Sequence, residues 1–271
     1  MISIVVPVFN EEPALLQRSL QSLVEQTCPD FECLIVDEST REDTLAVSAA
    51  LAARDPRFLH KRPDKRLGLA ASLNWGIEMA SHELLARFDA DDICEPERLA
   101  QQSQFLNAHP DVGVLGTGLS IIDQQGQVVR RRDYPQTHEQ IASRMQLTTA
   151  VAHPTVMMRR SLLRAAGSYR TDFRYAEDLE LWLRLLKRGV RFANLPGHLV
   201  RYRQTEFTRS SLHWRSNLRA RWINLAPTQI GMRALGLASV AVFCIVPPAW
   251  QQALYRRLVL SRAQATSTPQ P

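Results

Sequence analysis

The sequence predicts an α/β protein with a mostly parallel central sheet that helices cover on both faces. Apolar runs of strand length alternate with segments of helical apolar spacing through the first half of the chain. Two of these runs end abruptly in acidic residues, at the sheet edge where open α/β sheets bind ligands. With 271 residues, the chain can hold one large α/β domain and a small appendage.

The elements of the first half follow in regular alternation. Residues 2–8 form a β-branched run that is typical of a buried parallel strand, and leucines at helical spacing follow it. We expect a strand over residues 31–36, a helix over 42–53, a short strand over 57–60, and a helix over 69–80 that Gly68 opens. The next strand runs from residue 84 into a cluster of aspartates, and a helix follows over 96–108. This order predicts right-handed βαβ crossovers.

The middle of the chain has a different pattern. We expect a strand over residues 112–118, a hairpin over 121–132 with Gly126 at its turn, and a strand over 155–158. Ser161 is expected to cap a short helix to residue 166. A helix that begins at Glu177 has acids in its first turn and should end at Gly189. The three glycines within residues 112–118 are not followed by a helix, so they predict close sheet packing rather than a dinucleotide-binding loop.

Charge is distributed unevenly along the chain. The net charge is +6, but no acidic residue follows Glu206, whereas eight arginines do. Subtracting those eight charges leaves about −2 for the first 206 residues, so the basic character belongs to the tail. The four cysteines show neither metal-type spacing nor disulfide-like density, which suits a reducing cytoplasm. The first strand begins without a basic region or cleavage site, so we expect no signal peptide.

Three carboxylates lie within four positions, directly after the strand that starts at residue 84. They are Asp89, Asp91 and Asp92, and Asp37 follows a neighbouring strand in the same way. Clustered carboxylates repel one another unless a cation or donors neutralise them, and oxygen ligands suit Mg²⁺ or Mn²⁺. The pattern therefore predicts a metal and ligand site at this sheet edge. The alternative is a solvated acidic turn that caps the next helix.

Five segments in order resemble family 2 glycosyltransferases, which have the GT-A fold and include enzymes of bacterial surface-polysaccharide assembly. The resemblance covers about residues 1–205. Each segment is weak by itself, but their order and spacing are specific. The matching segments are Val5-Val6-Pro7-Val8-Phe9-Asn10-Glu11, Val36-Asp37-Glu38-Ser39-Thr40, Gly68-Leu69-Ala70-Ala71-Ser72-Leu73-Asn74, Asp89-Ala90-Asp91-Asp92 and Ala176-Glu177-Asp178-Leu179-Glu180-Leu181-Trp182.

The resemblance implies a role for each matching position. Asp178 would be the general base that takes the proton from the acceptor hydroxyl, with Glu177 beside it. Asp91 would ligate the divalent metal, Mg²⁺ or Mn²⁺, with Asp89 near the ribose, the donor sugar and the metal. Asp37 would accept a hydrogen bond from the nucleotide base. The implied donor-binding set is Pro7, Phe9, Asn10, Glu11, Asp37, Arg66, Asp89 and Arg203.

The chain departs from the family pattern at several points. The family often has a Gly after the acidic pair that corresponds to Asp37-Glu38, and this chain has none. Lys65-Arg66 stands where Asn is common. One of these two cations could contact the diphosphate; the alternative is that both are solvated loop charges. The segment 202–205 lacks the late His of many relatives, which leaves Arg203 as the alternative for neutralising charge. A histidine at position 153 either lines the acceptor side or is structural.

We expect three parts in the chain: a GT-A catalytic domain over residues 1–206, a basic and apolar helical tail over 207–264, and a disordered end over 265–271. The uncharged run 234–250 is at the lower limit of spanning length. Three interpretations remain: an interfacial helix with arginines on anionic headgroups, a single span, or a helix packed on the protein or a partner. The predicted location is cytoplasmic and peripheral to the inner face of the membrane. Nucleic acid is not an expected partner.

The predicted function is inverting, metal-dependent transfer of a sugar, hexosyltransferase-type, from a nucleotide-diphospho-sugar to a saccharide or lipid-linked acceptor. A UDP-sugar is the favoured donor. One alternative is a nucleotide-sugar-binding scaffold whose site has decayed. The other is a nucleotidyltransferase, which should carry a Gly-rich, basic loop after the first strand, whereas this chain has Phe9-Asn10-Glu11-Glu12 there.

Overall fold

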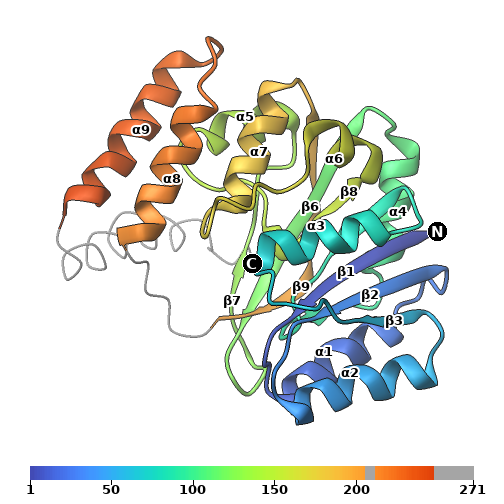
Figure 1. Cartoon of the computed structure of the whole chain (residues 1–271). Coiled ribbons are helices and arrows are strands. Elements are labelled where there is room, and N and C mark those ends of the chain that lie inside the picture. The colour runs from blue at the N-terminus through green and yellow to red at the C-terminus, as the bar shows by residue number, and fades with distance from the viewer. Residues whose placement is uncertain (205–210, 247–271) are drawn as a thin grey trace.

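The computed structural model describes residues 1–204 and 211–246, which form an α/β fold around one continuous sheet (Figure 1). Among these residues the strand order is β3-β2-β1-β4-β8-β6-β9-β5, and β7 pairs with β6. The expected disordered end, residues 265–271, lies outside the described residues.

The first half of the sheet is parallel, as expected from its βαβ pattern. It contains β1 (Ile2–Val8), β2 (Phe31–Asp37), β3 (Phe58–Lys61) and β4 (Leu84–Arg87), and β1 pairs in parallel with both β2 and β4. The connecting helices are α1 (Pro13–Val24), α2 (Glu42–Arg54) and α3 (Leu69–Met79). All of these strands and helices agree with the sequence-based prediction to within one or two residues. The carboxyl ends of β1, β2 and β4 therefore lie side by side.

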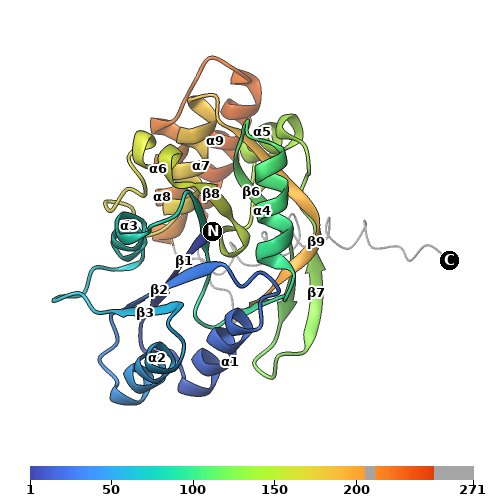
Figure 2. The same ribbon diagram turned by 90° about the vertical axis from the view of Figure 1, so that its right-hand side faces the viewer.

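The second half of the sheet is mixed, which corrects the expectation of a mostly parallel sheet. The short β8 (Met157–Arg159) lies antiparallel between β4 and β6 (Val112–Ile122). The hairpin partner β7 (Val128–Arg132) is antiparallel to β6, since a tight turn can join only antiparallel neighbours. The 13-residue strand β9 (Arg191–Arg203), which the sequence pattern did not suggest, is parallel to β6 and pairs antiparallel with β5 (Ile93–Cys94). Figure 2 shows β9 beside β6 and β7, where the sheet curls.

Helices cover both faces of the sheet, as predicted. Apolar side chains of α1, α2 and α4 (Arg98–Ala108) pack on one face. On the other face pack α3, α5 (His138–Met145), α6 (Arg160–Ala166) and α7 (Glu177–Lys187). The strand expected over residues 155–158 is present as β8, which begins two residues later than predicted, after a 3₁₀ turn, η1 (His153–Thr155).

Two local predictions have different outcomes. The glycines of β6 do provide close packing: a Cβ on Gly116 would lie 2.2 Å from Oδ1 of Asn194 on β9. The predicted cap at Ser161 is wrong, because Arg159 is the N-cap residue of α6 and makes no side-chain cap. The Ser161 hydroxyl instead donates to the Glu83 carboxylate at the start of β4, which is a tertiary contact that local sequence cannot reveal.

The last two described helices, α8 (Ser211–Ile223) and α9 (Ile230–Ile245), pack on each other and on the body. The buried Arg221 donates from its guanidinium to the carbonyl oxygens of Met145 and Gln146 at the end of α5. The buried Arg233 donates to the Asn224 carbonyl at 2.9 Å. Within the described ranges, no helix combines the length and hydropathy that crossing a membrane requires, and the predicted run 234–250 is described only to residue 246.

Candidate active site

The aspartate cluster follows β4 as a tight loop whose carboxylates face different surroundings. Asp92 is fully buried, and its Oδ1 accepts the backbone N–H of Arg203 at 2.8 Å. Burial, and then the charges of Asp89 and Asp91, raise the pKa of Asp92 well above its usual value. Burial and the charge of Asp89 raise the pKa of Asp91 to about 6. The Asp89 carboxylate forms an ion pair with the buried Arg87.

Glu11 joins this cluster from the loop after β1. Burial, followed by the charges of Asp91 and Asp89, raises the pKa of Glu11 to about 7. A carboxylate from the end of β1 therefore lies within electrostatic reach of two carboxylates from the end of β4. The sequence placed Glu11 in the donor-binding set by resemblance alone, and the structure brings it to the aspartates.

Asn10 connects the loops after β1 and β2. Its backbone is left-handed, with φ of 56°, and its Oδ1 accepts the backbone N–H groups of Thr40 at 2.8 Å and Arg41 at 3.1 Å. The side chain of this predicted donor-binding residue therefore holds the two loops together. Pro7 lies within β1 opposite Val36, and it is half-buried.

Phe9 and Arg66 contact each other at the same edge of the sheet. The Arg66 guanidinium carbon lies 3.6 Å from the centroid of the Phe9 ring, which is a close cation–π contact. The Arg66 guanidinium is therefore packed on an aromatic ring, whereas a solvated loop charge, one of the two sequence-based interpretations, would have no such contact. Its loop is fixed by Glu38, whose carboxylate accepts the backbone N–H groups of Leu67 and Gly68. The chemical role of Glu38, the residue at which the family pattern differs, was missed from sequence.

Asp37 is enclosed at the end of β2. Its side chain has no exposed surface, and its oxygens accept from Ser39 N at 2.9 Å and approach His60 Nε2 at 3.1 Å. Burial alone would raise the pKa of Asp37, but the hydrogen bonds from His60 and Ser39 outweigh it and hold the pKa below its usual value. His60, on β3, was not predicted as a site residue. Its only sequence signal is its position near the end of a strand next to β2.

Two acidic residues begin α7 on the other side of the aspartate loop. Glu177 is buried, and burial, followed by the charge of Asp178, raises its pKa to about 7. Asp178 is half-buried, and its Oδ1 accepts the backbone N–H of Leu179 at 2.7 Å. The residue before them, Ala176, has φ of 59°, a left-handed conformation that is strained for a residue with a Cβ. The charge of Asp89 also acts on Glu177, so the two acid groups share one site.

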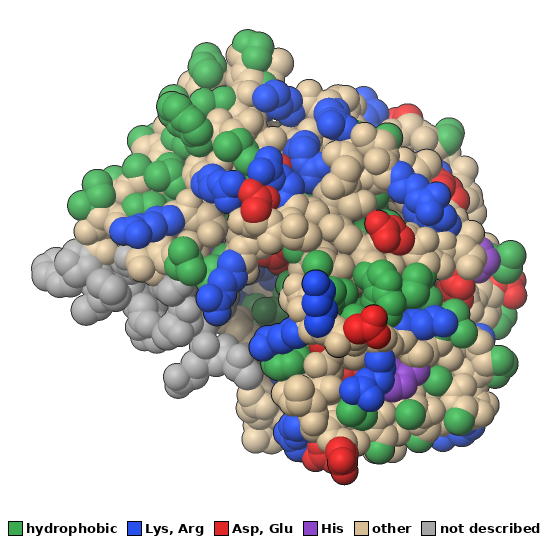
Figure 3. Space-filling view, viewed as in Figure 1, with side chains coloured by type: hydrophobic (Ala, Val, Ile, Leu, Met, Phe, Trp, Pro, Cys, Tyr) green, Lys and Arg blue, Asp and Glu red, His purple; other side chains and the backbone are tan. Residues whose placement is uncertain are grey.

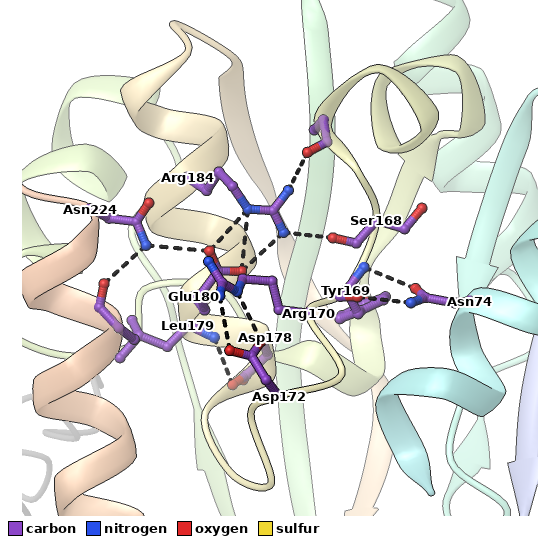
Figure 4. A network of polar contacts seen from close by, with 12 residues as sticks. Asn74, Ser168, Tyr169, Arg170, Asp172, Asp178, Leu179, Glu180, Arg184 and Asn224 are labelled. Carbon is purple, nitrogen blue, oxygen red and sulfur yellow. Dashed lines mark hydrogen bonds and ion pairs between the residues drawn. The ribbon is translucent and has the colours of Figure 1, made fainter. Parts of the chain in front are cut away.

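The loop that leads to α7 is anchored by paired polar contacts (Figure 4). Asn74 on α3 exchanges two hydrogen bonds with the backbone of Tyr169, at 2.7 and 2.9 Å. Arg184 on α7 pairs with Glu180 at 2.9 Å and donates to the Ser168 carbonyl at 2.6 Å. These contacts fix the loop, and thereby the start of α7, relative to the sheet.

His153 and Arg203 are both enclosed in the protein. His153 Nε2 lies 2.8 Å from the Tyr169 hydroxyl, and burial lowers the pKa of His153 well below its usual value, which favours the structural interpretation. Arg203 donates to the carbonyl oxygens of Asp91 at 3.0 Å, Asp123 at 2.6 Å and Gln124 at 3.0 Å. Its guanidinium thus holds the aspartate loop against the β6–β7 turn.

Figure 3 shows one face of the molecule hollowed near its centre, with Lys and Arg side chains around the hollow. Within residues 1–204 and 211–246, no set of three or more His, Cys, Asp or Glu side chains has the arrangement of a complete metal site. Asp89 and Asp91 do supply carboxylate oxygens, which are the ligand type that Mg²⁺ uses together with substrate phosphates.

Solved structures show which class of protein has this fold. The structure superposes on residues 1–349 of S. aureus TarS in complex with UDP-GlcNAc with a TM-score of 0.69 and 18% identity, over 97% of this chain and 77% of that one. A mannosyltransferase from Pyrobaculum calidifontis in complex with GDP-Man and Mn²⁺ gives a TM-score of 0.61 and 20% identity, over 96% and 80% of the two chains. The fold is of the GT-A type.

Sequence comparison assigns the family. Residues 3–167 match the model of glycosyl transferase family 2, and residues 86–266 match that of glycosyl transferase family group 2. The chain is 32% identical to the amylovoran biosynthesis glycosyltransferase AmsE of Erwinia amylovora, over 75% of this chain and 76% of that one. It is 29% identical to the O-antigen biosynthesis glycosyltransferase WbnJ of Escherichia coli, over 75% and 79%. The chain belongs to glycosyl transferase family 2, as its motifs predicted.

Proposed function

We propose that this protein is an inverting glycosyltransferase that moves a sugar from a nucleoside-diphospho-sugar, with UDP as the favoured nucleotide, to an acceptor hydroxyl. One observation carries the proposal: the loop with Asp89 and Asp91 and the helix start with Glu177 and Asp178 face one site. Carboxylates on two sides of a site match the two needs of inverting transfer, a base for the acceptor and an anchor for the donor diphosphate.

In the proposed reaction Asp178 is the general base. It accepts the proton of the acceptor hydroxyl while that oxygen forms its bond to the anomeric carbon of the donor, and the nucleoside diphosphate leaves from the opposite face. Asp178 suits this role better than Glu177 because it is the less buried of the two. The buried Glu177, with its pKa raised to about 7 by burial and then by the charge of Asp178, holds a proton more readily than an ordinary glutamate, which makes it the weaker candidate for a base that must be ionised.

The donor side of the proposed site fits a divalent cation. Burial, and after it repulsion by neighbouring carboxylates, raises the pKa of Asp91 and of Glu11, and a bound cation would relieve that repulsion. Asp91 and Asp89 would hold Mg²⁺ or Mn²⁺, which would supply electrostatic stabilisation of the leaving diphosphate. Phe9, with Arg66 stacked on it, and the Asp37–His60 pair would form the nucleotide end, and Asn10 would keep the loops in place.

We further propose a saccharide or lipid-linked acceptor in cell-surface polysaccharide biosynthesis, with the protein at the inner face of the membrane. The relatives named for amylovoran and O-antigen biosynthesis support the pathway. A groove of about 570 Å³ between α8 and α9, lined by Leu218, Trp222 and Leu237, supports a lipid-facing surface. Hydrophobic side chains gather over α9 in Figure 3, and no acidic residue follows Glu206 to repel anionic headgroups.

The test is calorimetric titration of the purified protein with UDP-, GDP- and dTDP-sugars, with and without Mn²⁺. Binding of one donor that requires Mn²⁺ supports the proposal and identifies the sugar. Turnover should release a nucleoside diphosphate, whereas release of pyrophosphate would instead indicate a nucleotidyltransferase. Donor binding without any turnover across an acceptor panel would favour a decayed, binding-only site.

A further inference from the structure

Arg87 is a buried cation at the centre of the acidic site. It is the last residue of β4, and its side chain is 5% exposed. Because side chains alternate along a strand, Arg87 lies on the same face of the sheet as Leu85, whose neighbours include the apolar side chains of α7. The guanidinium is therefore directed toward the face on which α7 packs.

The backbone of Arg87 is fixed on both sides. Its N–H donates to the Val156 carbonyl at 3.0 Å, and its own carbonyl accepts from the guanidinium of Arg98 at 2.8 Å. Arg98 is itself fully buried on α4. The Arg87 side chain thus starts from a rigid point in the middle of the sheet.

The guanidinium of Arg87 is committed to Asp89. Its two terminal nitrogens contact the two carboxylate oxygens, one on each. Such a fork determines the plane and the rotation of the carboxylate, which a single hydrogen bond does not. The remaining nitrogen, Nε, finds no hydrogen-bond partner among the described residues.

The charge of Arg87 also reaches the acceptor side of the proposed site. It favours the ionised form of Glu177, against the opposing effects of burial and of Asp178. The Arg87 charge therefore acts on carboxylates of two segments that are separate in sequence, the loop after β4 and the start of α7. Removing it would leave buried negative charge without compensation.

We propose that Arg87 is a positioning residue for the transfer reaction, which holds the Asp89 carboxylate in the orientation that meets the donor. The inference rests on the proposed function, because it assumes that Asp89 contacts the donor. This role requires the two parallel hydrogen bonds of a planar guanidinium. A lysine at position 87 would supply its positive charge at one point only and would not fix the rotation of the carboxylate.

The test compares Arg87→Lys with the matched control Arg57→Lys. Arg57 forms a second arginine–carboxylate fork, to Asp55, with bonds of 3.0 and 2.7 Å. It lies just before β3, at the edge of the sheet opposite to the carboxyl ends of the parallel strands. Titration with UDP and Mn²⁺, and with the donor that the wild type binds, measures affinity; release of nucleoside diphosphate measures turnover. We expect Arg87→Lys to lower kcat at saturating donor by about tenfold or more, and Arg57→Lys to lose thermal stability but to keep kcat and affinity within about twofold.

A double-mutant cycle tests whether Arg87 acts through Asp89. In an Asp89→Asn background, Arg87→Lys should lower kcat by no more than about twofold further. A folded Arg87→Lys variant with wild-type kcat and affinity overturns the inference. The inference is also overturned if Arg87→Lys lowers kcat in the Asp89→Asn background by the same factor as in the wild type. If Arg87→Lys does not fold, the double variant Arg87→Gln/Asp89→Asn removes both charges together, and wild-type turnover in that protein overturns the inference equally. Failure of the wild type to bind any nucleotide would instead refute the proposed function.

Discussion

Replacing Glu177 by glutamine should stabilise the protein, and more strongly at high pH. Burial and the neighbouring Asp178 raise the pKa of Glu177 from 4.5 to about 7. Since the folded protein keeps this proton to a higher pH than the unfolded chain, the free energy of unfolding falls as pH rises from about 4.5 to about 7. At about 1.4 kcal/mol for each pH unit, the penalty above pH 7 is roughly 3 kcal/mol, and glutamine does not incur it.

Thermal unfolding in EDTA at about pH 5 and about pH 8.5 measures this difference. The stability gain of Glu177→Gln over the wild type should be larger by roughly 2 kcal/mol at the higher pH, a Tm difference of about 5 °C. The exposed Glu97, changed to Gln, is the control for the loss of a carboxyl group at the protein surface. A Glu177→Gln gain that is the same at both pH values would refute the reasoning, because a packing effect does not depend on pH.

Three further variants test the site and the fold. Asp91→Asn should abolish Mn²⁺-dependent donor binding in calorimetry, and wild-type binding with that variant would exclude the metal role. Asp178→Asn should bind donor normally but lower transfer by about 100-fold or more, and an unchanged rate would remove it as the base. Gly116→Ala should destabilise the protein by about 1–3 kcal/mol in thermal unfolding, because its Cβ would lie 2.2 Å from Asn194 and 2.8 Å from Val151. Stability equal to that of the wild type would show that β6 and β9 separate easily.

The first half of the fold could be predicted because its signals are local. β1 and β2 are apolar runs, and β1, β2 and β3 are each followed by a helix whose apolar spacing is equally visible. The carboxyl ends of parallel strands necessarily share an edge, so the proximity of Glu11 to the aspartates follows from topology. In contrast, β8 pairs with β4 across more than seventy residues of sequence, and periodicity carries no information on such partners.

The polar details of the site were beyond prediction for a related reason. Glu38 and His60 obtain their roles from contacts with a loop and a carboxylate that lie elsewhere in the sequence. Arg203 is similar: its charge suggested a diphosphate contact, yet its hydrogen bonds go to backbone carbonyls. A side chain's type limits what it can donate or accept, but only the folded structure decides which partner it meets.

The proposed site concentrates features that oppose stability, and this concentration is itself an argument for function. Glu11, Asp91 and Glu177 each have a pKa raised by burial and by neighbouring carboxylates, so their ionised forms destabilise the folded protein near neutral pH. Two flanking residues, Asn10 and Ala176, have left-handed backbones. A fold that needed only to be stable could place apolar side chains here, as it does beneath the sheet. Repulsion of this kind is relieved when a cation or a hydroxyl donor enters, so the same energy that lowers stability favours binding of donor and acceptor.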